Sequence, residues 1–470
     1  MRRIYFFVCI IVLCCINSAQ AHLPCPVNGR GVLQCDAEVK SSYKKGVSLH
    51  FDVNSREESY AARMLTKSLQ ERGYVINANS GDYSIKFLID KRRYDAEAFA
   101  IIPEGNVIKI IGGDYRGLIY GALSLSEDLR NEILLDNAVA RSEKPKLMLR
   151  AVKYDLPWDP YRHSEALLDM MAENRLNALS LWNLHPYPFM IIPKNYPEAS
   201  PFTKEEFKEW QKLFQSIIGM AAERAIETYL IPFNIFVTPE FSVAHNVAMD
   251  NLDHHFYVRG ETAQIVKDYT RECVTQVLEE YPDLTGFGLT LGEGMAGMTP
   301  QEREAWMTET IIEGMRRANR PSKLVHRVPF SSTTESLGNT SVETERITRA
   351  SIEREADMGF TEGPIFADFK FNWSHSLSTP KLIKVHGGPL YDTYFNPVSD
   401  KYKVTWTARN EDIFCLRWGV PEFVRAHVKL NSPAYVGGYF IGSETYIPAK
   451  DYFTTDMSKA NWKWAFERQW

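Results

Sequence analysis

The chain has 470 residues, of which 24% are charged and 44% are hydrophobic, and its formal net charge is −5. This length exceeds one ordinary domain, so two or three are expected. The acidic balance and the lack of a basic run argue against nucleic acid as a partner, and no apolar stretch after the N-terminal segment reaches the roughly 18 residues of a membrane span.

The N-terminal segment has the features of a secretory signal. Arg2 and Arg3 precede an apolar run over 4–16, and the small-residue site Ala19-Gln20-Ala21 follows. We therefore predict a signal peptide over 1–21 and an N-terminal extension over 22–46, with export to the periplasm or the extracellular medium. Cys273 lies in apolar surroundings, which predict a buried thiol, and no zinc-binding spacing is present, so no metal is expected.

Residues 47–141 predict a small α/β accessory domain. Its expected elements, in chain order, are a strand over 47–52, a helix over 57–71, strands over 83–89, 98–102 and 107–111, and a helix over 117–132. A polar segment over 142–146, which contains Pro145, predicts the linker to the next domain.

The junction of the last predicted strand and helix contains four informative glycines. Gly112 and Gly113 would permit a tight turn with positive φ, Asp114 can cap the helix, and Gly117 and Gly121 would let it lie close to the sheet. This stretch resembles the end of the accessory domain that precedes the catalytic barrel in hexosaminidases and α-glucuronidases.

After the linker, short apolar runs alternate with helical patterns. The predicted strands are 147–154, 178–182, 228–233, 286–291, 324–328, 365–370, 404–407 and 434–440. Eight strands alternating with helices indicate a (β/α)8 TIM barrel over 147–455. A doubly wound sheet is the alternative, although no glycine-rich phosphate loop follows the first strand. Aromatic residues at helical spacing over 456–470 predict the start of a truncated C-terminal helical region, or else a terminal helix docked on the body.

In a barrel, the residues that follow the strands gather at one mouth, where such enzymes place their site. Tryptophans beside amide and charged side chains suit a sugar, because pyranose faces stack on rings while hydroxyls need directed partners. The candidate substrate-binding residues are Trp158, Arg162, Trp182, Asn183, His185, Asn234, Arg327, Lys370, Asn372, His375, Arg409, Asn410, Arg417, Trp418 and Glu444.

Glu293 is the strongest candidate for catalysis. An apolar strand delivers this carboxylate between Gly292 and Gly294, where the backbone can turn sharply. Glycosidic cleavage needs a proton donor, and a partly desolvated carboxyl group can take that role. Glu411, with Glu444 as the alternative, could serve as the second carboxylate. A separation of about 5–5.5 Å would indicate a nucleophile, and about 6.5–9.5 Å would leave room for water.

Four cations follow the predicted strands of this acidic chain: Arg327, Lys370, Arg409 and Arg417. Their convergence would indicate an anionic group in the substrate, such as the carboxylate of a uronic acid.

The order of these parts resembles the α-glucuronidases of glycoside hydrolase families 67 and 115. The likeness includes Glu293, the strand over 365–370 with its Lys370, and the aromatic start at Trp462. It implies inversion without a cofactor, with Glu293 as the acid and the base in the seventh-strand region. Family 67 has an aspartate a few residues after its lysine, and this chain has none there, which leaves Glu411 as the family-like base.

Three functions follow from these observations. The first is an inverting hydrolase for a uronic acid-containing polysaccharide or its oligosaccharides. The second is a polysaccharide lyase in which Lys370, His375 or Tyr391 abstracts a proton, and the third is a glycan-binding protein without turnover. An aromatic stripe exposed near the C-terminus would also favour a homodimer.

Overall fold

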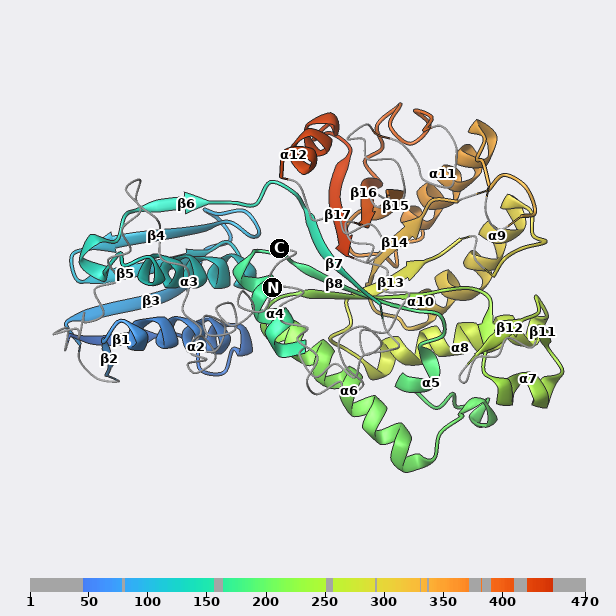
Figure 1. Ribbon diagram of the computed structural model, residues 1–470, viewed down its shortest axis with the longest axis horizontal. Coiled ribbons are helices and arrows are strands. Elements are labelled where there is room, and N and C mark those ends of the chain that lie inside the picture. The colour runs from blue at the N-terminus through green and yellow to red at the C-terminus, as the bar shows by residue number, and fades with distance from the viewer. Residues whose placement is uncertain are drawn as a thin grey trace, which may run out of the picture. The chain divides into compact units, whose positions relative to one another are not determined.

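The computed structural model describes residues 45–77, 81–155, 164–250, 257–291, 294–329, 331–335, 338–371, 382, 390–409 and 421–442. Within these ranges the chain forms a six-stranded sheet with two helices, followed by a closed eight-stranded barrel (Figure 1). The expected fold class is therefore confirmed. The proposed signal peptide and the aromatic C-terminal segment lie outside the described residues.

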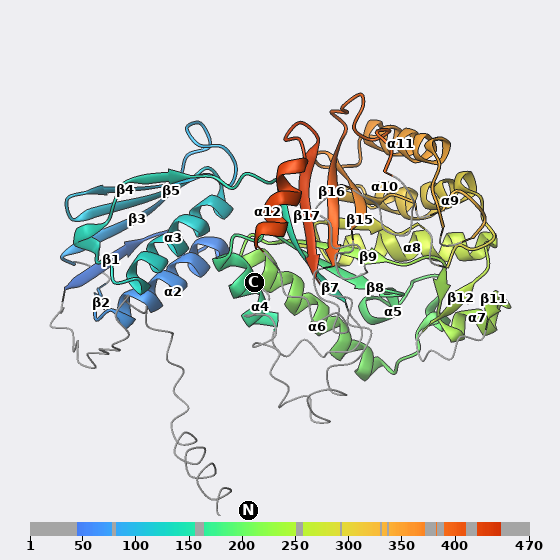
Figure 2. The same cartoon turned by 45° about the horizontal axis from the view of Figure 1, so that its top comes forward.

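The N-terminal sheet has the strand order β2-β1-β3-β5-β4-β6. Its strands are β1 (Gly46–His50), β2 (Val75–Ile76), β3 (Tyr83–Ile89), β4 (Phe99–Glu104), β5 (Val107–Gly112) and β6 (Arg141–Glu143). The helices α2 (Arg56–Glu71) and α3 (Tyr115–Arg130) lie side by side against one face of this sheet (Figure 2). The 3₁₀ turn η1 (Leu135–Asn137) precedes β6, whose pairing with β4 carries the sheet to Glu143, into the predicted linker.

The glycine-rich junction of β5 and α3 is shaped by close approach. The Asp114 side chain accepts a hydrogen bond from the backbone N–H of Gly117 at 2.7 Å, as expected of an N-cap. Neither Gly112 nor Gly113 has positive φ, so that expectation was wrong. Instead, a Cβ at Gly113 would lie 1.9 Å from the Asp95 carbonyl oxygen, and one at Gly117 would lie 2.2 Å from the Ala98 oxygen. Glycine is required there because backbone occupies the space.

All eight predicted barrel strands are present, within a few residues at their ends. They are β7 (Leu149–Asp155), β8 (Ala178–Asn183), β9 (Glu227–Pro232), β13 (Gly286–Leu289), β14 (Lys323–Arg327), β15 (Ile365–Phe371), β16 (Tyr402–Arg409) and β17 (Val436–Gly442). The strands are parallel, and β17 pairs with β7, which closes the barrel. Closure excludes the doubly wound alternative.

Helices alternate with these strands and pack around them. They are α4 (Ser164–Glu173), α5 (Tyr187–Met190), α6 (Lys204–Glu223), α8 (Gln264–Glu280), α9 (Pro300–Met307), α10 (Glu313–Arg317), α11 (Val342–Asp357) and α12 (Pro421–Leu430), with the 3₁₀ turn η2 (Pro197–Ala199) and the π turn η3 (Thr308–Ile312). After β9 the chain adds α7 (Pro239–His245) and a small sheet of β10 (Phe236–Val237), β11 (Ala248–Asp250) and β12 (Val258–Gly260). No helix in the described ranges is long and apolar enough to cross a membrane.

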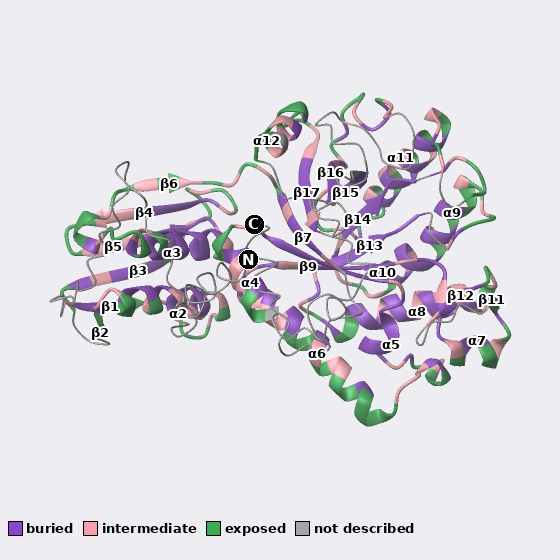
Figure 3. Ribbon diagram, viewed as in Figure 1, coloured by how far each residue is buried: buried purple, intermediate pink, exposed green. Residues whose placement is uncertain are grey.

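The barrel lumen is a packed core. The inward-facing side chains of Ala151, Tyr229, Val325, Phe366 and Phe440 belong to one buried cluster. Figure 3 shows the barrel strands buried and the outer faces of the surrounding helices exposed. The strands therefore hold the residues at their ends on a rigid frame.

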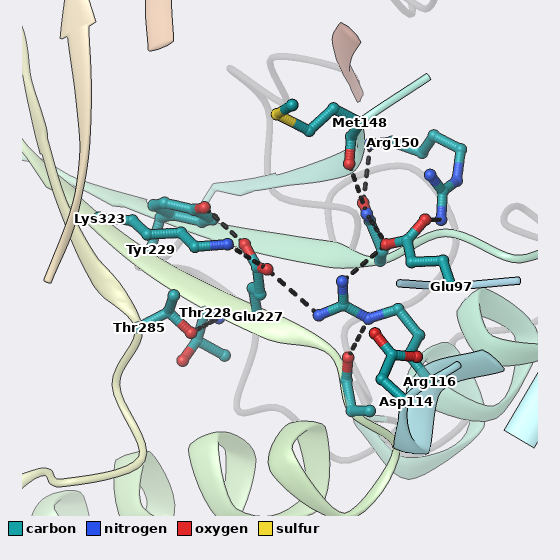
Figure 4. Close-up of polar contacts among 12 residues, drawn as sticks. Glu97, Asp114, Arg116, Met148, Arg150, Glu227, Thr228, Tyr229, Thr285 and Lys323 are labelled. Carbon is teal, nitrogen blue, oxygen red and sulfur yellow. Dashed lines mark hydrogen bonds and ion pairs between the residues drawn. The ribbon is translucent and has the colours of Figure 1, made fainter. Parts of the chain in front are cut away.

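An ionic network joins the sheet to the N-terminal end of the barrel, which we call the floor (Figure 4). Arg116, at the start of α3, donates to Glu97 at 2.7 Å, to Glu227 of β9 at 3.2 Å and to the Ala225 carbonyl at 2.6 Å. Glu227 also accepts from Lys323 at 2.6 Å. Burial alone would raise the pKa of the Glu227 carboxyl group, but Arg116 and Lys323 outweigh it and the pKa is lowered.

Glu97 links the same network to β7 and β8. It forms an ion pair with the Arg150 guanidinium at 2.8 Å and accepts a hydrogen bond from the Asn177 amide at 2.7 Å. A second ion pair between the sheet unit and the barrel joins Arg56 to Asp283, with two hydrogen bonds of 2.9 Å. The glycine-rich junction therefore positions a cation that binds the barrel floor.

Candidate active site

The C-terminal ends of the barrel strands hold a buried group of charged and aromatic side chains. Lys153 of β7, Trp182 of β8, Arg327 of β14 and Asp368 of β15 are each at most 5% exposed. These residues come from four strands, and their side chains meet inside the barrel at its mouth. We call these four residues, together with Lys370, the mouth cluster.

Two cations of the mouth cluster lie over the Trp182 ring. The Arg327 guanidinium carbon is 4.7 Å from the ring centroid, and Lys153 Nζ is 4.9 Å from it. The indole N–H donates to the Ser180 hydroxyl at 2.9 Å, and Phe233 meets the ring edge-on at 5.9 Å. The ring quadrupole attracts both cations, so Trp182 holds them in place; the predicted stacking of a sugar on it remains untested.

Asp368 is the carboxylate of the mouth cluster. It accepts hydrogen bonds from Thr405 at 3.1 Å and Thr407 at 2.7 Å, and one of its oxygens lies 3.8 Å from Arg327 Nε. Burial raises the pKa of Asp368 to about 6, although Arg327 and the two hydroxyl groups act in the opposite direction. At neutral pH the carboxylate is therefore mainly ionised.

Lys370 lies two residues after Asp368 on β15, so both side chains are on the same face of the strand. It is 6% exposed. The mouth cluster thus combines the cations of Lys153, Arg327 and Lys370 with the one carboxylate of Asp368. All three cations have further interactions. Within the described part of the mouth, positive charge exceeds negative charge.

Two of the candidate residues have structural contacts. The Asn183 side-chain oxygen accepts the backbone N–H of His185 at 2.9 Å. The His185 ring is 1% exposed, lies 3.0 Å from the Tyr269 hydroxyl and is stacked with that ring. Burial lowers the pKa of His185 to about 3, so it is neutral. These contacts favour a packing role for His185, and substrate binding by either residue remains a prediction.

Asn234 lies close to the predicted catalytic turn. A Cβ on Gly294 would lie 2.2 Å from the Asn234 carbonyl oxygen, and Gly294 has a φ of +79°. Gly294 thus has the left-handed backbone that favours glycine, while Gly292 and Glu293 lie outside the described residues. Asn234 is 3% exposed, and its side-chain nitrogen has no hydrogen-bond partner among the described residues.

The remaining candidates cannot be placed. Both predicted catalytic residues, Glu293 and Glu411, lie outside the described residues. The same is true of Trp158, Arg162, Asn372, His375, Asn410, Arg417, Trp418 and Glu444, and only the backbone of Arg409, in β16, is described. Their roles stay predictions.

Sequence reasoning missed Lys153, Asp368, Thr405 and Thr407. A signal for them existed, because each is a polar residue at an inward-facing position of a predicted barrel strand. No three His, Cys, Asp or Glu side chains of the described mouth are close enough to share an ion; the one such group in the described ranges lies elsewhere.

Comparison with known proteins finds relatives by structure only. No family model matches the sequence, and no curated protein matches it. A solved structure described as a GH138 enzyme targeting pectin rhamnogalacturonan II is similar over 84% of this chain, with a TM-score of 0.68 and 24% identity. This chain covers 46% of that protein's length, or about half of it.

Hexosaminidases are more distant structural neighbours. The Streptomyces plicatus N-acetyl-beta-hexosaminidase matches with a TM-score of 0.53 and 12% identity, over 91% of this chain and 86% of its own. The Bacteroides fragilis beta-N-acetylhexosaminidase matches with a TM-score of 0.51 and 12% identity, over 86% of this chain and 82% of its own. At these identities the likeness establishes the shared fold, an accessory α/β sheet followed by a TIM barrel.

Proposed function

We propose that this protein is a glycoside hydrolase that acts on a uronic acid-containing polysaccharide or its oligosaccharides. The observation that carries the proposal is the mouth cluster, in which Lys153, Arg327 and Lys370 come together beside Asp368 within the described part of the mouth of a net acidic chain. Such a site suits an anionic sugar, because a guanidinium can bind a carboxylate through two hydrogen bonds.

The structural neighbours support the hydrolase class. Those with the shared fold include a GH138 enzyme and two hexosaminidases. The first of these is described as targeting the pectin rhamnogalacturonan II. The word galacturonan denotes a polymer of a uronic acid. The α-glucuronidase type and export to the periplasm or the extracellular medium are finer parts of the proposal.

In the proposed mechanism, Glu293 donates a proton to the leaving oxygen and Glu411 activates water. The positive φ of the next residue, Gly294, and its close approach to the Asn234 backbone support a turn at this point of the chain. Arg327 and Lys370 would hold the uronate carboxylate, and Asp368 with Trp182 would orient Arg327. Charge-assisted hydrogen bonds to the substrate would then fix the sugar against the acid.

The test is incubation of the purified protein with glucuronoxylan oligosaccharides and with oligosaccharides of rhamnogalacturonan II, followed by mass spectrometry and ultraviolet absorbance. We expect a free uronic acid, with the gain of one water. An unsaturated product would instead indicate a lyase, and binding without turnover would indicate a glycan-binding protein.

The variant Glu293→Gln should abolish hydrolysis while substrate binding persists, because an amide cannot donate the proton. Glu205→Gln, an exposed change on α6, is the matched control and should keep full activity. Normal turnover by the Glu293 variant would refute the assignment of the acid.

A further inference from the structure

A second group of ionisable side chains lies in the barrel wall, outside the lumen. His326 is in β14, Glu304 is in α9 and Glu355 is in α11, and each is at most 3% exposed. Arg327, the next residue of β14, takes part in the mouth cluster, and successive side chains of a strand face opposite sides. The group therefore lies behind the mouth cluster, between the strand and two helices. We call it the wall cluster.

The contacts of His326 determine which of its ring nitrogens carries a proton. Its Nδ1 lies 3.2 Å from the Arg327 carbonyl oxygen, which only accepts hydrogen bonds, so Nδ1 is the donor. Its Nε2 lies 3.1 Å from a Glu304 oxygen and 3.7 Å from a Glu355 oxygen. When the ring is neutral, the Nε2 lone pair therefore points toward the two carboxylates.

The two carboxylates are unequally satisfied. The other Glu304 oxygen accepts a hydrogen bond from the Thr348 hydroxyl. Neither oxygen of Glu355 has a hydrogen-bond partner among the described residues, although this side chain is fully buried. A buried carboxylate is costly without a compensating charge, and here that charge would come either from a protonated His326 or from a cation bound where these groups meet.

We propose that Glu304, His326 and Glu355 bind a divalent transition-metal ion of the Zn²⁺ type. Imidazole and carboxylate are ligands that such ions accept, whereas Ca²⁺ and Mg²⁺ prefer oxygen alone. Bonds of about 2.0–2.1 Å to a tetrahedral ion place its ligand atoms about 3.3 Å apart. The two measured separations of 3.1 and 3.7 Å lie close to this value, and all three ligand atoms lie within 4.8 Å of one another.

Charge and surroundings agree with this assignment. Two carboxylates and a neutral imidazole balance a divalent ion, so the buried site would carry no net charge. The Arg327 carbonyl contacts His326 at Nδ1, and the Thr348 hydroxyl donates a hydrogen bond to Glu304. Metal ligands in proteins typically have such outer contacts, which fix their orientation. The ion would fasten α9 and α11 to β14, so its role is structural and does not depend on the proposed function.

The test begins with the tag-free, full-length protein. Its metal content is measured by plasma mass spectrometry as purified, after dialysis against a chelator, and after return of Zn²⁺. We expect about one ion per chain, and a rise in the melting temperature of about 3 °C when free zinc is 100 times its dissociation constant. Protein that holds no metal and shows no thermal response to zinc would overturn the proposal.

Two variants separate the metal from a shared proton. Glu355→Gln should lose the metal and the thermal response to zinc, while Glu343→Gln, an exposed change on the same helix, should keep both. If a proton alone joined the three groups, the amide that replaces the Glu355 carboxylate could donate to Glu304, and the melting temperature would stay or rise with no zinc response in either protein. If the unaltered protein binds zinc but hydrolyses none of the uronate-bearing substrates, the result counts against the proposed function and leaves the metal site standing.

Discussion

The floor and the mouth of the barrel both contain buried charges, but they balance them differently. At the floor, Glu97 and Glu227 each contact three different side chains through hydrogen bonds or ion pairs. At the mouth, three cations accompany one described carboxylate, and two of those cations lie over an indole ring. At the floor the described charges of opposite sign are paired with one another, whereas the described part of the mouth brings cations from three strands together around one aromatic ring and one carboxylate.

The largest expected effect is the loss of a cation from the floor. Arg116→Ala leaves Glu97 and Glu227 without their shared partner, and breaking a buried ion pair in this way costs about 3–5 kcal/mol of unfolding free energy. Chemical denaturation should show this loss, while kcat of the remaining folded enzyme stays unchanged. Lys144→Ala, which removes an exposed pair with Asp95, should have no measurable effect. Equal stability of the two variants would contradict the contrast.

A smaller effect, on activity, is expected at the mouth. Arg327→Ala should lower kcat/KM on a uronate-bearing substrate by about 10- to 150-fold, which corresponds to about 1.5–3 kcal/mol for a charge-assisted hydrogen bond. Arg327→Lys should lose less, and a neutral glycoside should be affected least. The control is Arg92→Ala, an exposed change between β3 and β4 of the N-terminal sheet. If Arg327→Ala lowered kcat/KM equally for neutral and acidic substrates, Arg327 would not bind the substrate carboxylate.

The smallest effect on activity concerns pH. Because burial raises the pKa of Asp368 to about 6, its pairing with Arg327 weakens as pH falls through that value. Activity should therefore show an acid limb near pH 6, and Asp368→Asn should be several-fold less active at pH 7 with that limb absent. If the Asp368→Asn variant lost activity at the same acidic pH, the titration would belong to a group other than Asp368.

The same shift has a defined sign for stability. The folded state binds the Asp368 proton more tightly than the unfolded state, whose reference pKa is 3.8. The unfolding free energy should therefore fall, relative to the Asp368→Asn variant, as pH rises from about 4 to about 6, by at most about 3 kcal/mol, and should be flat above. A rise over that range would contradict the assigned direction.

Much of the fold could be predicted from the sequence. Apolar runs separated by helical patterns located every barrel strand, since buried parallel strands have continuous apolar sequences. The short strands β2 and β6 and the small sheet β10–β12–β11 were missed, because two- or three-residue strands leave no period to detect. The role of Arg116 was also missed, as its partners Glu97 and Glu227 are distant in the sequence.

The position of some candidate residues in the barrel could be predicted, while their roles stay predictions. Arg327 and Lys370 were expected at the mouth from their positions at strand ends, and the structure buries both there. Trp182 was expected to bind sugar, but its ring contacts cations that come from two other strands, which only the closed barrel brings together. The wall cluster gave no motif, since its three ligands come from three separate elements.

The floor network also bears on the order of synthesis. Arg116 and Glu97 leave the ribosome before Glu227 and Lys323, and domains generally fold as units, the N-terminal one first. The sheet can therefore fold first and position Arg116, which then forms an ion pair with Glu227 of β9. Lys323 of β14 contacts the same carboxylate once that strand has been synthesised. In that sense the accessory unit acts as a built-in template for barrel closure, and a barrel produced without it would have to bury Glu227 with one cation fewer.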